Sequence, residues 1–352
     1  MSNLFNEVRI NKLVLKNRFI MSAAIGLREA EMFATLAKEN VGLIISGGLE
    51  TNEIANFEKI VQAVHTNHGK IALQLVTSIG GRFGFDADPI AVSVLQKDNP
   101  FFNPLVAYCP HHEATEKEIE TIIDSYAESA SIAERIGADA VEIHSAHQSF
   151  LSQFLSPITN PRTDRWGGCI ENRMRIHQQI LAAIRAKVGD SFPILIKVGV
   201  EDALPDGLKF IDGLEIASRL AVGYDALEIS MGLQDFSKLY ATGDWSGTSM
   251  QRKNNCYRNW TREIKNQVSV PVIMTGGIRS FESIEEMMNN HEADLFGLCR
   301  PLIREPNLIS RWKKNDLRPA KCVSCNQCIT EIYMKGNPLE CFLESKIKPQ
   351  AG

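Results

Sequence analysis

Val141 to Arg175 reads VEIHSAHQSFLSQFLSPITNPRTDRWGGCIENRMR, and this stretch decides the fold. Apolar residues typical of a buried strand run into His144 and His147, and a loop rich in Arg, Asp and Gly then leads into an amphipathic helix. Polar side chains therefore gather where a predicted strand ends. In (β/α)8 barrels, functional residues lie at the C-terminal ends of the strands in this way.

The same pattern of a short apolar strand and an amphipathic helix recurs along the chain. Strands are predicted at 19–22, 41–46, 71–76, 140–144, 194–198, 226–230, 272–275 and 295–298. Helices are predicted at 27–38, 54–68, 116–136, 170–188, 211–220, 257–267, 280–289 and 302–312. This alternation, without a G-x-G-x-x-G motif after the first strand, predicts an α/β fold of the closed (β/α)8 TIM-barrel type rather than an open doubly wound sheet. We expect the barrel to span 1–315 and a short cysteine-containing extension, 316–352, to pack on it.

Composition excludes several classes of protein. The chain has 352 residues and a net charge of −4, and its Lys and Arg residues are dispersed, which argues against nucleic-acid binding. The first residues lack the apolar run of a signal peptide, and no stretch approaches the length of apolar residues needed to cross a membrane. We therefore expect a cytoplasmic protein, in which clustered cysteines act as ligands rather than as disulfides.

Glycines follow the last two predicted strands, in Thr275-Gly276-Gly277 and in Gly297-Leu-Cys-Arg300. The loops after these strands are the usual phosphate site of such barrels, and a nearby Arg adds charge. The pattern favours a phosphate-bearing ligand. The alternative is that these glycines only permit tight turns.

Gln74 and Lys197 each sit in an otherwise apolar strand. A buried polar head without a partner is costly, so both are expected to meet a ligand at the barrel mouth. A cation suits a flavin ring, which becomes anionic on reduction. A structural salt bridge of Lys197 with Asp202 or Glu142 is the alternative.

His144 and His147 are spaced so that both rings could face one pocket. Two imidazoles can hydrogen-bond an oxyanion or bind a metal, and we favour the oxyanion because no third ligand is obvious in the loop. A structural histidine pair is the remaining alternative.

Two loops are also notable. Residues 80–110 form a long insertion that is either a lid over the site or a surface loop. In the central loop, we expect ion pairs to hold the backbone in place, formed by Arg162, Asp164 and Arg165.

The central stretch resembles the signature of the Old Yellow Enzyme family, FMN-dependent NADH:flavin oxidoreductases and ene-reductases that include the barrel part of 2,4-dienoyl-CoA reductases. The similarity continues, in order, through Asn17-Arg18, Met21 to Ala24, Gln74-Leu75, Lys197 and Gly297 to Arg300. It implies FMN at the barrel mouth and hydride passing from NAD(P)H through flavin N5 to an electron-poor alkene, such as an α,β-unsaturated carbonyl compound or enoate. It also implies a homo-oligomer.

The resemblance assigns roles to individual positions. Ser22, Ala23 and Ala24 would lie against the flavin ring, Gln74 and Lys197 would bind its pyrimidine side, and Gly276, Gly277, Gly297 and Arg300 would line its phosphate site. His144 and His147 would hold the substrate carbonyl oxygen. Ser149 stands where the family commonly has a Tyr that protonates the substrate, and a serine hydroxyl is a poorer acid than a phenol. Either water, a Cys or a Tyr from another loop, such as Tyr240, donates the proton in its place, or the reaction is not simple alkene reduction. The segment after residue 24 is short and would leave one wall of the pocket open.

Cys322, Cys325 and Cys328, followed by Cys341, resemble the [4Fe–4S] site that some of these relatives carry after the barrel, although the spacing differs by one residue in two gaps. Zinc and no metal are the alternatives. A cluster would favour a second hypothesis, an electron-transfer subunit reduced by a ferredoxin-like protein. A third hypothesis is a flavin-free aldolase or isomerase that uses Lys197 as an amine.

Overall fold

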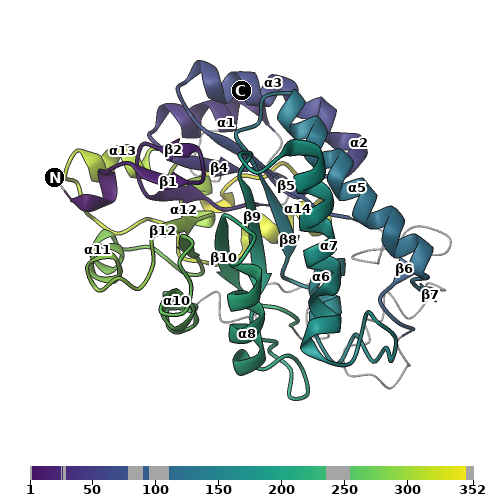
Figure 1. The fold of residues 1–352 in the computed structure, drawn as a ribbon. Coiled ribbons are helices and arrows are strands. Elements are labelled where there is room, and N and C mark those ends of the chain that lie inside the picture. The colour runs from purple at the N-terminus through teal and green to yellow at the C-terminus, as the bar shows by residue number, and fades with distance from the viewer. Residues whose placement is uncertain are drawn as a thin grey trace.

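Eight parallel strands close into a barrel within the residues that the computed structural model describes, which are 2–24, 26, 29–77, 90–94, 111–234 and 254–345 (Figure 1). They pair in sequence order, with the last strand beside the first. The strands are β3 (Phe19–Met21), β4 (Leu43–Ile45), β5 (Ile71–Leu75), β8 (Ala140–Ser145), β9 (Ile194–Gly199), β10 (Ala226–Ser230), β11 (Val272–Met274) and β12 (Leu295–Leu298). The predicted (β/α)8 TIM barrel is confirmed.

Helices surround the barrel between successive strands (Figure 1). They are α1 (Ala30–Lys38), α2 (Thr51–Ile54), α3 (Glu58–Thr66), α5 (Glu116–Arg135), α6 (Phe150–Leu155), α7 (Ile170–Val188), α8 (Phe210–Leu220), α10 (Arg258–Lys265), α11 (Phe281–Asn289), α12 (Arg300–Arg304) and α13 (Leu308–Lys313). Short 3-10 turns lie at η1 (Asn3–Phe5) and η2 (Ala55–Phe57), and the extension adds α14 (Gln327–Lys335) and α15 (Phe342–Ser345). Apolar faces of these helices pack on the outward side of the strands and form the main core.

The N-terminal hairpin packs against the barrel interior and was not predicted. Strands β1 (Val8–Ile10) and β2 (Leu13–Leu15) are antiparallel, and Ile10, Leu13 and Leu15 are buried with the inward-facing strand residues. That inner cluster also contains Ile20, Leu43, Ile45, Ala72, Ala140, Leu195, Ala226, Ile273 and Leu295. The hairpin therefore seals one end of the barrel with apolar side chains.

Two predicted helices are interrupted in the structure. The predicted helix at 302–312 divides into α12 and α13 because Pro306, with no N–H, cannot continue the helix begun at Arg300. The predicted helix at 54–68 begins as α2, passes through the turn η2 and continues as α3. Most of the 80–110 insertion lies outside the described residues; its described part, 90–94, contributes β6 (Ile90–Ala91), which pairs with β7 (His112–Glu113).

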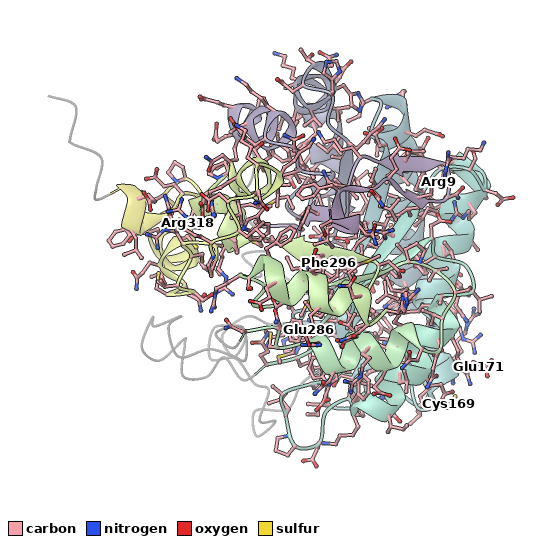
Figure 2. All side chains as sticks on the ribbon, turned by 90° about the vertical axis from the view of Figure 1, so that its left-hand side faces the viewer. Arg9, Cys169, Glu171, Glu286, Phe296 and Arg318 are labelled. Atoms are coloured by element: carbon pink, nitrogen blue, oxygen red, sulfur yellow. The ribbon has the colours of Figure 1, made fainter. Side chains whose placement is uncertain are left out.

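The extension lies at the end of the barrel opposite the hairpin. Figure 2 shows Arg9 of β1 and Arg318, near the start of the extension, on opposite sides of Phe296 in β12. A Cβ atom at Gly26 would lie 3.1 Å from Ile332 Cδ1, so α14 lies against Gly26. The open pocket wall expected after residue 24 remains a prediction. The division at 315/316 remains a prediction.

Among the described residues, no helix is both long and apolar enough to span a membrane.

Candidate functional site

Four polar side chains form a layer inside the barrel, called here the polar layer: Gln74, Glu142, Lys197 and Glu228. Each stands two residues after an alanine or leucine of the inner cluster, and alternation along a strand puts both on the same inward face. All four are 5% exposed or less. Because they come from the four neighbouring strands β5, β8, β9 and β10, the barrel interior changes here from apolar to polar.

Contacts within the polar layer pair an amide with an acid and a base with an acid. Gln74 Nε2 donates to Glu142 Oε2 over 2.7 Å, and Lys197 Nζ lies 2.8 Å from Glu228 Oε1. Burial opposes the charge of Lys197, but Glu228 and Glu142 raise the pKa of its amine above the ordinary value. The alternative of a Lys197 salt bridge named Asp202 or Glu142 as the partner, and the partner is instead Glu228. Asp202 accepts hydrogen bonds from the backbone N–H groups of Leu208 and Leu233.

His144 and His147 meet just beyond the polar layer. Their ring centroids are 5.6 Å apart, and His144, two residues after Glu142, shares its inward face. His147 has a left-handed backbone, with φ of +52°, which brings its Nε2 to 2.7 Å from Ser230 Oγ on β10. The structure thus brings the two predicted histidines together, and it adds Ser230, which the sequence did not indicate.

Ser149 is part of the turn that carries these histidines. Its hydroxyl donates to the His144 carbonyl oxygen over 3.0 Å, and the residue is 3% exposed at the N-terminus of α6. That hydrogen bond engages the hydroxyl proton. Ser149 as a proton donor remains a prediction, and Tyr240 lies outside the described residues.

Ser22, Ala23 and Ala24 leave β3 at the C-terminal mouth. Ser22 is 3% exposed, and its Oγ has no hydrogen-bond partner among the described residues. A Cβ atom at the neighbouring Gly297 would lie 2.2 Å from that Oγ, so a side chain there would force Ser22 to move. An unsatisfied buried hydroxyl beside a position without a side chain is consistent with a ligand edge lying here.

Gly276 and Gly277 follow β11 with φ of +85° and +79°, a conformation that glycine adopts without strain. A Cβ atom at Gly276 would lie 2.5 Å from the Tyr257 ring, and its carbonyl accepts from Cys256 N over 3.0 Å. Arg300 begins α12 and donates a hydrogen bond to Asn326 Oδ1 in the cysteine segment. The glycines and Arg300 thus follow adjacent strands, as a phosphate site requires.

The cysteine segment is attached to the barrel through its polar residues. Arg300 contacts Asn326 and Arg279 contacts Ser324 Oγ, and both contacted residues have left-handed backbones. Burial raises the pKa of the Cys328 thiol to about 12, with Cys299 as a neighbouring influence. In the described part of the chain, no three His, Cys, Asp or Glu residues are grouped so that they could hold a metal ion. Metal binding by Cys322, Cys325, Cys328 and Cys341 remains a prediction.

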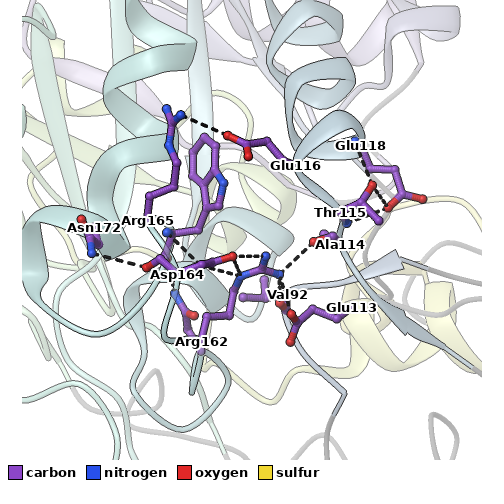
Figure 3. Close-up of polar contacts among 12 residues, drawn as sticks. Val92, Glu113, Ala114, Thr115, Glu116, Glu118, Arg162, Asp164, Arg165 and Asn172 are labelled. Atoms are coloured by element: carbon purple, nitrogen blue, oxygen red, sulfur yellow. Dashed lines mark hydrogen bonds and ion pairs between the residues drawn. The ribbon is translucent and has the colours of Figure 1, made fainter.

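Arg162 holds the central loop in place, as we expected. Its guanidinium donates to the carbonyls of Val92 and Ala114, each over 2.9 Å, and forms an ion pair with Asp164 at 2.5 Å (Figure 3). The Arg162 side chain is 5% exposed. It therefore joins the loop after α6 to Val92 within the insertion and to Ala114 just after it.

The protein is therefore a (β/α)8 barrel whose candidate site is built from polar residues at the ends of several strands. Residues 37–318 match the NADH:flavin oxidoreductase / NADH oxidase family. The chain belongs to this family, which confirms the resemblance to Old Yellow Enzyme.

Individual relatives differ in chemistry. N,N-dimethylglycine/sarcosine dehydrogenase of Chromohalobacter salexigens is 29% identical over 94% of this chain and 51% of its own length. Cinnamate reductase of Clostridium sporogenes is 29% identical over 92% of this chain and 55% of its own. The chain thus spans about half the length of these relatives. A 2-naphthoyl-CoA reductase structure superposes with a TM-score of 0.84 at 22% identity, covering 96% of this chain and 56% of that one, which supports the fold.

Proposed function

We propose that this protein is an FMN-dependent oxidoreductase that uses NAD(P)H to reduce an electron-poor alkene, such as an α,β-unsaturated carbonyl compound or enoate. Family membership and the polar residues at the barrel mouth support a flavin site, and the name of the cinnamate reductase relative supports the alkene. When bound, FMN would supply the hydride chemistry between NAD(P)H and one alkene carbon, and the other carbon would take a proton from water or a nearby side chain.

The observation that carries the proposal is the placement of complementary groups around one mouth. Gln74 and Lys197 would face the pyrimidine side of the flavin, and Ser22, Ala23 and Ala24 would line its ring. Gly276, Gly277, Gly297 and Arg300 would hold the phosphate. His144 and His147, 5.6 Å apart, would donate hydrogen bonds to the substrate carbonyl oxygen and stabilise the charge that develops there.

Lys197 is not placed to act as the free amine of an aldolase. Its ammonium is paired with Glu228, and the two buried carboxyls raise its pKa, so the unprotonated amine needed for imine formation is disfavoured. This argues against a flavin-free aldolase or isomerase.

The test is an anaerobic absorption spectrum followed by titration with NADH and NADPH, then with cinnamate. We expect flavin bands that bleach on addition of the nucleotide and return with cinnamate. N,N-dimethylglycine would act as an electron donor rather than as an acceptor. It is therefore added to the oxidised enzyme in a parallel sample, without nucleotide. Bleaching by the amine, with none by NAD(P)H, would replace alkene reduction by amine oxidation.

The histidine pair is tested separately. His144→Ala/His147→Ala protein should bind FMN yet lose the charge-transfer band that phenols give on stacking over an oxidised flavin. His65→Ala is the control, because His65 is a partly exposed histidine hydrogen-bonded to Asp139 on the outside of the barrel. A phenol band that survives in the double variant would contradict the oxyanion role.

A second candidate function is an electron-transfer subunit that carries FMN and a [4Fe–4S] cluster and is reduced by a ferredoxin-like partner. The observation that favours it is the run of Cys322, Cys325, Cys328 and Cys341, which contains Asn326, a hydrogen-bond partner of Arg300. Arg300 is the residue that we expect to hold the flavin phosphate. Iron and acid-labile sulfide at about four per chain support it. Cys325→Ser should abolish that iron, and Cys169→Ser, at an exposed cysteine, should retain it. Zinc, or protein without metal, would refute the cluster.

A further inference from the structure

The charges of the polar layer do not balance if every group ionises. Glu142 and Glu228 offer two carboxylates, and Lys197 offers one ammonium. Strand β9 lies between β8 and β10, and Lys197 stands opposite Glu228 on β10 and opposite His144 on β8. Glu142 precedes His144 by two residues on β8, and its charge also acts on the Lys197 amine. Both glutamates are 0% exposed, and an uncompensated charge at such a depth is strongly disfavoured.

The contacts show where the excess charge goes. Lys197 Nζ lies 2.8 Å from Glu228, whereas Glu142 accepts a hydrogen bond from the neutral amide of Gln74. Burial and the neighbouring Glu228 raise the pKa of Glu142 well above its ordinary value. Cys299, which also interacts with Lys197, has its pKa raised by burial and remains a neutral thiol. The layer then contains the Lys197–Glu228 ion pair and one further buried acid, Glu142, whose protonated form is favoured by burial.

We propose that Glu142 and Glu228 act as a single counter-ion for Lys197: they share one proton, either acid can carry the negative charge, and together they keep the charge of Lys197 neutralised. They are positioning residues, since they act through Lys197. The inference deepens and rests on the proposed function, because Lys197 is the group expected to face the flavin.

Neutralisation has a direct consequence for a flavin at this mouth. A free ammonium in a buried site stabilises an anion much more than the same ammonium does when a carboxylate lies beside it. The two glutamates therefore lower the affinity of the site for reduced, anionic FMN relative to its affinity for oxidised FMN. Removing one glutamate changes little, because the other ionises in its place.

The first experiment follows the shared proton and needs no flavin. Infrared spectra of the wild-type protein, Glu142→Gln and Glu228→Gln are compared for the C=O stretch of a buried carboxylic acid. We expect the band in the wild-type protein and its loss in both variants, because the remaining glutamate ionises to pair with Lys197. Glu292→Gln is the matched control, since Glu292 is a buried acid paired with Arg258 outside the barrel interior, and it should retain the band.

The second experiment measures FMN binding in its oxidised and reduced forms. For Glu142→Gln/Glu228→Gln, the preference for reduced FMN should rise at least about tenfold, equivalent to about 30 mV for a two-electron couple. Each single variant should change that preference by less than about threefold, a departure from additivity that identifies coupled sites. Adding Lys197→Met to the double variant should bring the preference back toward the wild-type value.

Outcomes separate this inference from the proposed function. If Glu228→Gln retains the carboxylic acid band, Glu142 is an independent buried acid and the shared counter-ion is refuted, even if the double variant does not fold. A tenfold change in one single variant would refute it as well. If the wild-type protein binds no FMN, the proposed function fails together with the flavin consequence, whereas the infrared result still decides whether the proton is shared.

Discussion

Replacing Arg162 with Ala should destabilise the protein by about 3–5 kcal/mol, because two buried hydrogen bonds from its guanidinium to backbone carbonyls are lost. The guanidinium makes two 2.9 Å hydrogen bonds to the carbonyls of Val92 and Ala114 and pairs with Asp164 (Figure 3). Hydrogen bonds to charged groups contribute about 1.5–3 kcal/mol each, so the two carbonyl contacts alone reach this range.

The measurement is the free energy of unfolding in urea, compared with that of Arg165→Ala. Arg165 is three residues away and pairs with Glu116 at 3.0 Å, but both side chains are about half exposed. An exposed pair contributes about 0–1 kcal/mol, so this variant should stay close to the wild-type protein. If Arg162→Ala and Arg165→Ala unfold at the same urea concentration, Arg162 does not hold the loop, and the burial argument is wrong.

Three further predictions concern stability. Gly297→Ala should cost about 1–3 kcal/mol by overpacking against Ser22, measured in urea, and unchanged stability would show that the β3 and β12 ends can separate. Burial lowers the pKa of His177 to about 4, whereas a histidine in the unfolded chain has a pKa of about 6.5. The unfolded state therefore binds the proton first, and the free energy of unfolding should fall by about 3 kcal/mol as the pH drops from about 6.5 to about 4. His177→Gln should reduce that loss, and an identical pH profile would contradict it. Ser149→Ala should lower the free energy of unfolding by about 1 kcal/mol, because its hydrogen bond to the His144 carbonyl oxygen is lost. If the variant instead keeps its stability and loses alkene reduction, Ser149 is a proton donor.

The barrel was predictable because its strands are short apolar runs separated by helices with apolar faces. The hairpin was not, since β1 and β2 have only three residues each and their burial depends on contacts with the far ends of the barrel strands. Pro306 was a readable helix break inside the predicted helix at 302–312. It was outweighed by the apolar residues on either side of it.

The site was predictable where a polar residue stands out at a strand end, as His144, Gln74 and Lys197 do. The partner of Lys197 was not, because it depends on the register between strands: Glu228 stands opposite Lys197 on β10, whereas Glu142 stands opposite Leu195. Local sequence does not fix that register. Ser230 is an ordinary last residue of a strand. Only the left-handed turn at His147, which no local residue requires, brings it into contact with the ring.

The two contacts between barrel arginines and the cysteine segment affect how this chain can be dissected. Cutting after residue 315 would remove the cysteines, but it would also remove the side chains of Asn326 and Ser324 from Arg300 and Arg279. A shortened chain with weakened flavin binding would then look as though it had lost a metal centre. Single cysteine replacements, with the segment left whole, are the substitutions that keep these two effects apart.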